Sequence, residues 1–255
     1  MTPAPILVEQ RGPVLIVTLN RPDKRNAVNL AMASAIAEAM DELDCRDDLT
    51  VGVLAANGPS FCAGMDLKAF LEGERPSVPG RGFAGLVERP PHKPLIAAVD
   101  GHAVAGGFEI VLACDLIVAA SHATFGLPEV KRGLVAGGGG LLRIQDRVPY
   151  HHAMEWALTG RAVTAQEALD LKLVNRLAEP GGALDAALAL ADEIGQNAPL
   201  AVRATKQVMV RSRDWPFESA FSEQAKITEP VRSSQDAREG ATAFREKRAA
   251  VWAGV

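Results

Sequence analysis

Residues 95–120 read LIAAVDGHAVAGGFEIVLACDLIVAA. The runs Leu95–Val99 and Leu116–Ala120 are short and apolar, as in strands buried inside a sheet. Between them, Asp100-Gly101 indicates a turn and Gly106-Gly107 precedes a predicted helix that ends near Cys114. The order strand, glycine-rich turn, helix, strand predicts a layered α/β fold.

The residues before this stretch repeat the same order. Pro13–Leu19 and Val51–Ala55 are predicted strands, because both are short, apolar and closed by turn residues. Val28–Leu43 between them has apolar residues at three- and four-residue steps, which predicts an amphipathic helix. A repeated strand–helix–strand unit is therefore expected, although no fixed sequence period is visible.

After Pro180-Gly181-Gly182 the pattern becomes helical. This change divides the chain into an α/β body over residues 1–182 and a helical region over residues 183–255. The predicted helices of the second part are Ala183–Ile194, Pro199–Arg211, Pro216–Ile227 and Asp236–Val251, and two more are expected in the body at His151–Leu158 and Thr164–Asp170.

Residues 72–94 contain many prolines and glycines among charged residues. They predict a mobile surface loop, and loops of this length often serve as lids or binding loops.

The composition excludes several classes of protein. The chain has 255 residues, with 27 Lys and Arg against 31 Asp and Glu, a formal net charge of −4. A mild acidic excess gives no electrostatic reason to bind nucleic acid or an anionic membrane. Cys45, Cys62 and Cys114 suggest no disulfide framework. Without a visible signal sequence or an apolar run of about 18 residues, a soluble cytoplasmic protein is expected.

Several short motifs lack the context that their chemistry needs. Residues 80–85 match G-x-G-x-x-G but follow no strand and precede no useful helix, so a dinucleotide site is not expected. Gly137–Gly140 lacks the Gly-Lys-Ser/Thr of a phosphate-binding loop. His151-His152 has no third metal ligand nearby, and no G-x-S-x-G hydrolase motif occurs.

Two glycine-containing turns precede predicted helices, at Phe61–Leu67 and Gly101–Glu109. The first amides of a helix have no intrahelical acceptor, so two such turns could form an oxyanion hole. The simpler explanation is that these glycines only permit tight turns. Glu109 and Glu129 are each, taken alone, ordinary first-turn helix residues, but together near such amides they could move protons around an activated carbonyl.

Five segments together resemble the enoyl-CoA hydratase/isomerase (crotonase) family. They cover nearly the whole chain, in the order that the family has, and are LNRPDKRNAVN (19–29), FCAGMDLKAF (61–70), GHAVAGGFEIVLACDLIVAA (101–120), FGLPEVKRGLVAGGGGLLRI (125–144) and REGATAFREKR (238–248). The resemblance implies a spiral of ββα repeats with a helical C-terminal trimerisation region.

The resemblance also implies a site. The oxyanion hole matches the amides of Met65 and Gly106, and the two catalytic glutamates match Glu109 and Glu129. Family members with both glutamates add water to 2-enoyl-CoA thioesters, so a hydratase is expected, with Glu129 as acid/base at C2 and Glu109 activating water. The backbone around Gly137 corresponds to the loop behind that water.

Coenzyme A is expected as part of the substrate, with no metal or redox cofactor. The residues that the resemblance assigns to CoA or substrate binding are Lys24, Arg25, Ala27, Ala63, Asp66, Leu67, Lys68, Phe244 and Lys247. Lys247 corresponds to a lysine that reaches CoA on a neighbouring subunit, within a homotrimer or a dimer of trimers.

Other functions remain open at this point. Within the family, the chain could be an enoyl-CoA isomerase, a thioester hydrolase or a dehydratase of a particular hydroxyacyl-CoA. A catalytically silent CoA-binding protein is the alternative from another class, and the presence of both Glu109 and Glu129 speaks against it. Met65, Leu67, Phe70 and residues 72–94 are expected to set acyl specificity, but the sequence does not name the acyl group.

Overall fold

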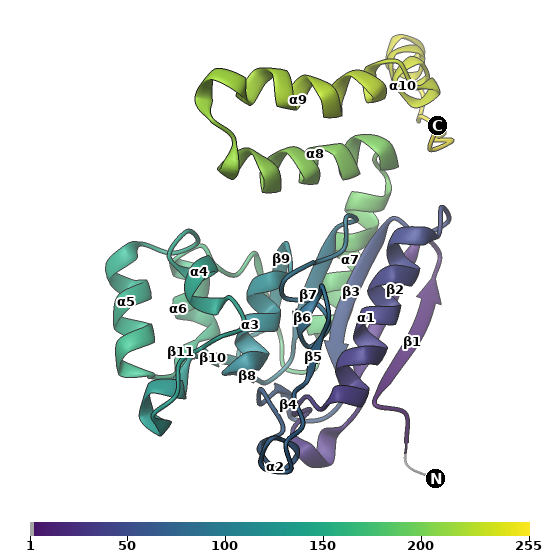
Figure 1. Cartoon of the computed structure of the whole chain (residues 1–255). Helices are drawn as coiled ribbons and strands as arrows, with labels where there is room; N and C mark the ends of the chain where they lie inside the picture. Colours follow the sequence, from purple (N-terminus) through teal and green to yellow (C-terminus); the bar gives the residue numbers. More distant parts are fainter. Residues whose placement is uncertain (1–2) are drawn as a thin grey trace.

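The computed structural model, which describes residues 3–255, has two sheets in its α/β body (Figure 1). The larger sheet is parallel except for the antiparallel pair β1 and β2 at one edge. Its strands, in sheet order, are β1 (Ile6–Arg11), β2 (Val14–Leu19), β3 (Val51–Ala56), β7 (Leu95–Val99), β9 (Leu116–Ala120) and β12 (Arg176–Ala178).

The smaller sheet runs beside the larger one, and a two-stranded hairpin stands apart from both. The smaller sheet has the order β11 (Val163–Thr164), β10 (Thr124–Gly126), β8 (His102–Val104) and β4 (Ser60–Cys62), and the hairpin pairs β5 (Ser77–Val78) with β6 (Gly82–Phe83).

Successive strand pairs alternate between the two sheets. Strands β3, β7 and β9 enter the larger sheet, and each is followed in the chain by β4, β8 or β10 of the smaller sheet. The three pairs keep the same neighbour order in both sheets, which describes a spiral of repeated turns. The spiral α/β fold expected from the sequence is confirmed.

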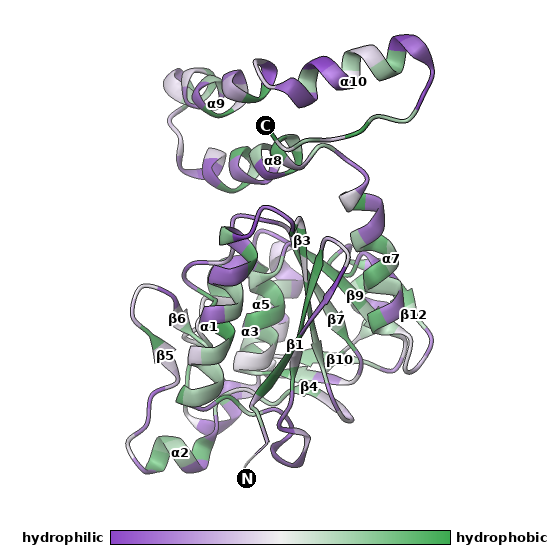
Figure 2. Cartoon of the chain, turned by 90° about the vertical axis from the view of Figure 1, so that its right-hand side faces the viewer, coloured by the Kyte–Doolittle hydropathy of each residue, from purple (hydrophilic) through white to green (hydrophobic). Residues whose placement is uncertain are grey.

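Helices fill and cover this spiral. In the body they are α1 (Leu30–Cys45), α2 (Leu67–Leu71), α3 (Gly106–Ala113), α4 (Gly140–Ile144), α5 (Tyr150–Thr159) and α6 (Ala165–Asp170), with the 3-10 helices η1 (Pro22–Lys24) and η2 (Pro128–Arg132). All eight residues of α3 are buried. Apart from Glu109 the helix is apolar, because a helix with no exposed face has no polar side to present (Figure 2).

The prediction that residues 72–94 form a mobile surface loop is wrong. They form a packed segment that contains the hairpin β5–β6. Ala84, Leu86 and Val87 are buried in the core, and the buried Arg81 pairs with Asp41 of α1. Proline and glycine richness here reflects tight turns rather than mobility, because the glycines supply positive φ angles within a packed chain.

The structure also moves several element boundaries. The predicted strands are β2, β3, β7 and β9, and the sequence did not predict β1, β4, the hairpin strands β5 and β6, or the short strands β8, β11 and β12. The last helix, α10 (Gln235–Glu246), ends five residues before the predicted Val251, because Lys247 adopts a left-handed conformation with φ 54°. Helix α9 (Phe217–Arg232) extends beyond the predicted Ile227 and continues through Pro230.

The C-terminal helices differ in how they contact the body. Helix α7 (Ala183–Gly195) begins beyond the boundary predicted at residue 182, yet it packs on β3, β7 and β9. Helices α8 (Pro199–Arg211) and α9, joined by η3 (Ser212–Asp214), contain no buried residue and extend beyond the body (Figure 1), to which Lys206 of α8 is joined by an ion pair with Asp115. Among residues 3–255, no helix has the length and apolarity to span a membrane.

Candidate active site

Two main-chain amides are presented side by side at the start of α2 and of α3. Met65 precedes α2, and Gly106 opens α3. A Cβ atom on Gly64 would lie only 3.0 Å from the Gly106 nitrogen, so the two turns are in direct contact. Neither the Met65 nor the Gly106 amide has an acceptor among residues 3–255. The predicted pair of oxyanion donors is therefore brought together.

Local backbone geometry explains how each amide becomes free. The residues flanking Met65 bond to Val28, because the Val28 amide donates to Gly64 and the Asp66 amide donates to Val28. In such a parallel bridge the Met65 N–H points to the other side of the strand. Gly106 follows Ala105, whose φ of 53° and ψ of −131° form a strained turn that aims the next amide outward.

Glu109 lies in the first turn of α3, and its side chain is fully engaged with a glycine turn. The residue is 4% exposed, and Oε1 accepts hydrogen bonds from the amides of Gly138 at 2.7 Å and Gly140 at 2.9 Å. Burial raises the pKa of the Glu109 carboxyl, and the two amides and the Arg143 charge partly oppose that rise. The two amides favour the ionised form of Glu109, but burial is the larger effect and leaves its pKa raised.

Glu129 lies in η2 and has the opposite surroundings. The residue is half-buried, and its Oε2 atom is buried without a hydrogen-bond partner in the described chain. Burial raises the pKa of Glu129, and the charge of Glu109 raises it further, against its own amide and Arg132. A buried carboxyl oxygen without a partner favours the protonated form.

The two carboxyl groups are close enough to influence each other. Because the Glu109 charge raises the pKa of Glu129, ionising one disfavours ionising the other. The two carboxyl groups therefore titrate interdependently. A carboxylate that can accept a proton and a carboxyl that can donate one, beside two free amides, are the groups needed to add or remove water next to a carbonyl.

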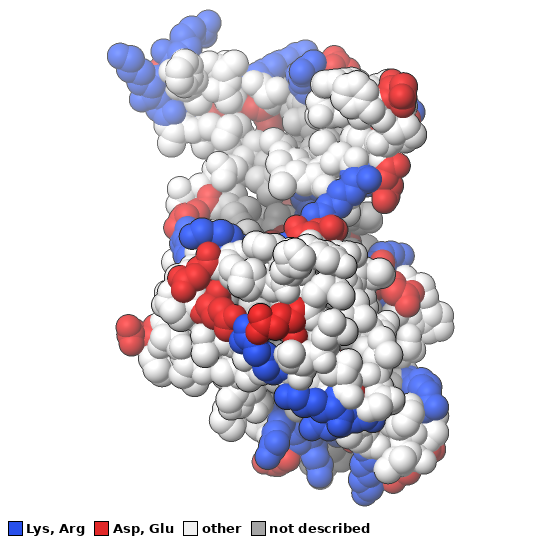
Figure 3. Space-filling model, turned by 90° about the vertical axis from the view of Figure 1, so that its left-hand side faces the viewer, with Lys and Arg blue, Asp and Glu red and all other residues white. Residues whose placement is uncertain are grey.

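The predicted CoA-binding segments also meet in space. The Ala63 amide donates to the Arg25 carbonyl at 3.0 Å, so residues 24–27 run beside residues 63–68. Lys24, Arg25 and Lys68 are exposed. Asp66 does not face outward as a free acid, because it caps α2 and pairs with Arg21 at 3.0 Å. Lys and Arg side chains gather toward the lower end of the face in Figure 3, the end where α2 and β4 lie in Figure 1.

Two predicted CoA contacts lie elsewhere in the chain. Phe244 and Lys247 are both exposed, and they belong to the end of α10. Figure 1 places α10 at the opposite end of the molecule from α2 and β4. These residues do not join the glutamates within one chain.

Three contacts at the site were missed from the sequence. The amides that hold Glu109 come from Gly138 and Gly140, whereas the predicted Gly137 is exposed. Phe83 of β6 reaches Gly106, where a Cβ atom would lie 2.6 Å from its ring. The run of four glycines was a usable signal for the turn, but nothing in the sequence indicates the position of Phe83.

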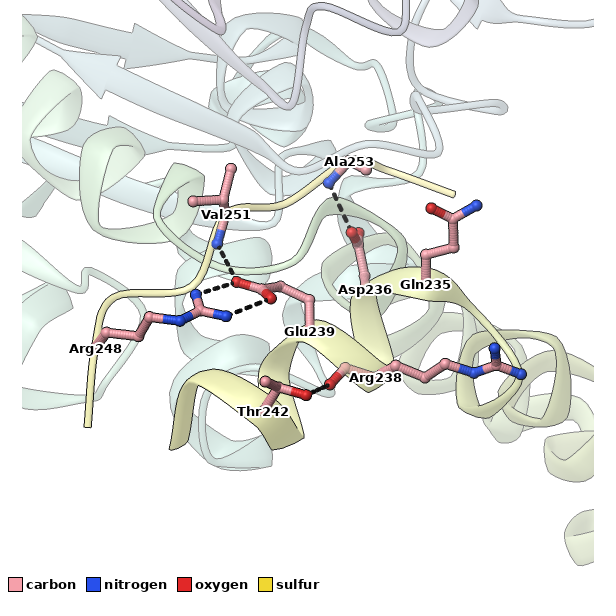
Figure 4. Close-up of a pocket in the computed structure, with 8 residues that line it drawn as sticks. All are labelled: Gln235, Asp236, Arg238, Glu239, Thr242, Arg248, Val251 and Ala253. Carbon is pink, nitrogen blue, oxygen red and sulfur yellow. Dashed lines mark hydrogen bonds and ion pairs between the residues drawn. The ribbon is translucent and has the colours of Figure 1, made fainter. Parts of the chain in front are cut away.

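A cavity of about 480 Å³ lies away from the glutamates, between α10 and the last residues of the chain (Figure 4). Most of its charged groups are used within the fold. Arg248 pairs with Glu239, and Asp236 accepts from the amides of Ala253 and Gly254. These bonds fasten the end of the chain to α10, and Arg238 also lines the cavity.

The residues that the structure describes do not form a metal-binding cluster, and the thiol near the site is not reactive. Within residues 3–255, no three His, Cys, Asp or Glu side chains are grouped to hold a metal ion. The Cys62 thiol is buried beside Gly64, and burial raises its pKa to about 12, which removes its nucleophilic form at neutral pH.

Known proteins share this fold and sequence. The family model for enoyl-CoA hydratase/isomerase matches residues 9–255. A carnitinyl-CoA dehydratase from Salmonella arizonae is 44% identical, with 96% of this chain and 97% of that protein aligned. Enoyl-CoA hydratase EchA1 from Mycobacterium marinum is 58% identical, with 99% and 100% coverage and a TM-score of 0.98.

A third relative, a carnitinyl-CoA hydratase from Mycobacterium avium, is 43% identical with full coverage of both chains and a TM-score of 0.80. These matches span the spiral body and the C-terminal helices alike. With its free amides, its two coupled glutamates and its spiral of strand pairs, the chain belongs to the enoyl-CoA hydratase/isomerase family.

Proposed function

We propose that this protein is an enoyl-CoA hydratase, which adds water across the 2,3 double bond of an enoyl-CoA thioester and catalyses the reverse dehydration. The observation that carries the proposal is the pair of carboxyl groups with opposite surroundings, Glu109 held by two amides and Glu129 with a buried unpartnered oxygen. An isomerisation, which only moves one proton, needs a single acid/base.

The reaction divides between the two carboxyl groups. Ionised Glu109 takes a proton from water while the water oxygen forms a bond to C3. Protonated Glu129 delivers a proton to C2. The electron pair of the double bond passes through an enolate whose oxygen accepts from the Met65 and Gly106 amides. Each such donor typically contributes roughly 10²–10³ in rate. Proton exchange with solvent then returns Glu109 to its ionised form and Glu129 to its protonated form.

The CoA portion is proposed to bind along residues 24–27 and 63–68. The exposed Lys24, Arg25 and Lys68 supply positive charge for phosphate groups at that edge. Phe244 and Lys247 are proposed to reach CoA bound to a neighbouring copy, because their own site lies at the other end of the chain. No metal or redox cofactor takes part in this scheme, since water addition changes no oxidation balance.

A homotrimer, alone or paired, is proposed as the assembly. The C-terminal helices carry large apolar side chains that nothing in the chain covers, and Met209, Phe217, Phe221 and Phe244 are each 69% exposed or more. Apolar surface on that scale marks a protein interface. Sedimentation equilibrium tests it: a monomer at micromolar concentration contradicts the assembly without affecting the chemistry.

The function is tested by incubating the protein with a panel of 2-enoyl-CoA thioesters in ¹⁸O-labelled water. The conjugated absorbance is followed, and the products are analysed by mass spectrometry. The proposal expects loss of absorbance and one labelled oxygen at C3. A shifted double bond without label would identify an isomerase, and free thiol with an intact double bond would identify a thioester hydrolase. Either result overturns the proposal.

The same panel addresses the acyl group. Two relatives carry names that refer to carnitinyl-CoA, whereas a third is named only as an enoyl-CoA hydratase. The panel should therefore include a trimethylammonium-bearing enoyl thioester beside straight short and long chains. Relative kcat/KM values across it identify the substrate class directly.

A further inference from the structure

Arg143 lies on α4 between three segments of the site. Its guanidinium donates a hydrogen bond to the Val87 carbonyl, within residues 72–94. Its amide donates to the Gly139 carbonyl at 3.1 Å. A Cβ atom on Gly139 would collide with Nη1 of Arg143, so the guanidinium lies directly over that glycine. One side chain therefore joins residues 72–94 to the glycine turn.

That turn is the one that holds Glu109. Gly138 and Gly140, on either side of Gly139, donate the two hydrogen bonds to Oε1 of Glu109. Gly139 has φ 85°, a conformation that glycine adopts freely. A run of glycines has no side chains of its own to fix its shape, so a group packed over it determines how well the two amides stay aligned.

The charges around Arg143 reinforce the contact. Its positive charge lowers the pKa of Glu109, and Glu109 raises the pKa of Arg143 against the effect of burial. Glu129, with Arg132 beside it, faces Glu109 from η2. Arg147 and Cys114 are the other titratable groups near Arg143: Cys114 raises the pKa of Arg143, and Arg143 lowers the pKa of Arg147.

We propose that Arg143 is a positioning residue for the reaction: its guanidinium clamps the Gly138–Gly140 turn against the Val87 carbonyl and so fixes the two amides that hold the Glu109 carboxylate. It touches neither substrate nor the reacting atoms. The inference rests on the proposed function of Glu109 as the group that activates water.

The test compares Arg143→Gln and Arg143→Lys with the wild type in hydration of 2-butenoyl-CoA. For Arg143→Gln, kcat is expected to fall about 10- to 100-fold with KM within about twofold, because misplacement of a catalytic group affects the chemical step. The acid limb of the kcat–pH profile moves to higher pH, since losing the cation raises the pKa of Glu109. Arg143→Lys keeps the positive charge, so the acid limb of its kcat–pH profile should stay at the wild-type position. Its kcat should lie between those of Arg143→Gln and the wild type.

Arg147→Gln is the matched control. Arg147 lies four residues after Arg143, and it also donates to a carbonyl, that of Cys114 at 3.2 Å. Among residues 3–255 its side chain has no hydrogen bond to the glycine turn. Arg147→Gln is expected to lower the melting temperature but leave the pH profile in place. An equal loss of kcat and an equal shift in both variants would overturn the proposal.

Amide hydrogen exchange supplies a readout that does not depend on turnover. Measured by mass spectrometry without substrate, Arg143→Gln is expected to exchange faster over residues 134–144, whereas Arg147→Gln is not. If Arg143→Gln exchanged these amides at the wild-type rate, the proposal that Arg143 clamps the Gly138–Gly140 turn would be wrong even if activity fell. If the wild type hydrates no enoyl thioester, the proposed function fails, and the exchange result still decides whether Arg143 holds the turn.

Discussion

The regions around Glu109 and Glu129 differ in the hydrogen-bond partners that they give to a carboxyl group. Glu109 lies in a regular helix of eight buried residues, and its carboxylate is held by two amides and faced by an arginine. Glu129 lies in a short 3-10 helix with no buried residue, and one of its oxygens is buried without a partner.

This difference allows two glutamates to take different roles, one as proton acceptor and the other as proton donor. Hydrogen bonds to the charged form lower a carboxyl pKa, whereas burial without partners raises it. When both groups are glutamates, only their surroundings can make one an acceptor and the other a donor. Four measurements on three variants test whether the two regions differ as described.

The largest effect is expected from Glu129→Gln. The amide cannot deliver a proton to C2, and general acid–base groups contribute about 10²–10⁴ in rate, so kcat should fall by about 10³ or more. The affinity for CoA, measured by isothermal titration calorimetry, should change little. A variant that keeps more than a tenth of the wild-type kcat would contradict the assignment of Glu129 as the proton donor.

Glu109→Gln should cost about 10²–10³ in kcat, because the amide oxygen can still accept from Gly138 and Gly140 but cannot remove a proton from water. Single-turnover hydration measures this loss. Exchange of the C2 proton of a saturated acyl-CoA, which needs Glu129 alone, should fall much less. Equal loss of both activities would remove the distinction between the two regions.

Gly138→Ala tests the amides rather than the acid. A Cβ atom there would lie 2.7 Å from Oε2 of Glu109, so the carboxylate must shift, and kcat should fall about 10- to 100-fold. Gly137→Ala is the matched control, because its nearest atom is the Val135 carbonyl oxygen at 3.9 Å and its own amide is retained. Similar kcat values for the two variants would show that the turn does not position Glu109.

The smallest effect is on stability. Because the folded state raises the pKa of Glu129, native protein binds that proton more tightly than unfolded protein does. The free energy of unfolding therefore falls as pH rises from about 4.5 through the raised pKa. Glu129→Gln lacks this dependence, so its melting temperature should exceed that of the wild type at neutral pH by more than it does at pH 5. Calorimetry at pH 5 and pH 7.5 measures it, and a gain of the same size at both pH values would contradict the pKa shift.

Apolar runs and turn residues were sufficient for the central strands of the larger sheet and for most of the helices. Strands β7 and β9 are continuous apolar runs because both faces of a central parallel strand are covered, and the pattern locates them without knowledge of the rest. Strands β1 and β4 were missed for the converse reason. Strand β1 is exposed over five of its six residues, and β4 has only three, so neither gives a distinct pattern.

The sequence by itself determined the order of the spiral units, the glycine turns before α2 and α3, and which two glutamates to consider. Those features depend on local preferences and on a family resemblance along the chain. Only the tertiary structure decided that Gly138 and Gly140, not Gly137, hold Glu109, that residues 72–94 are packed, and that Arg143 spans the two. Such facts join residues between 29 and 56 positions apart, and the direction of an amide or a guanidinium follows from packing that no local pattern encodes.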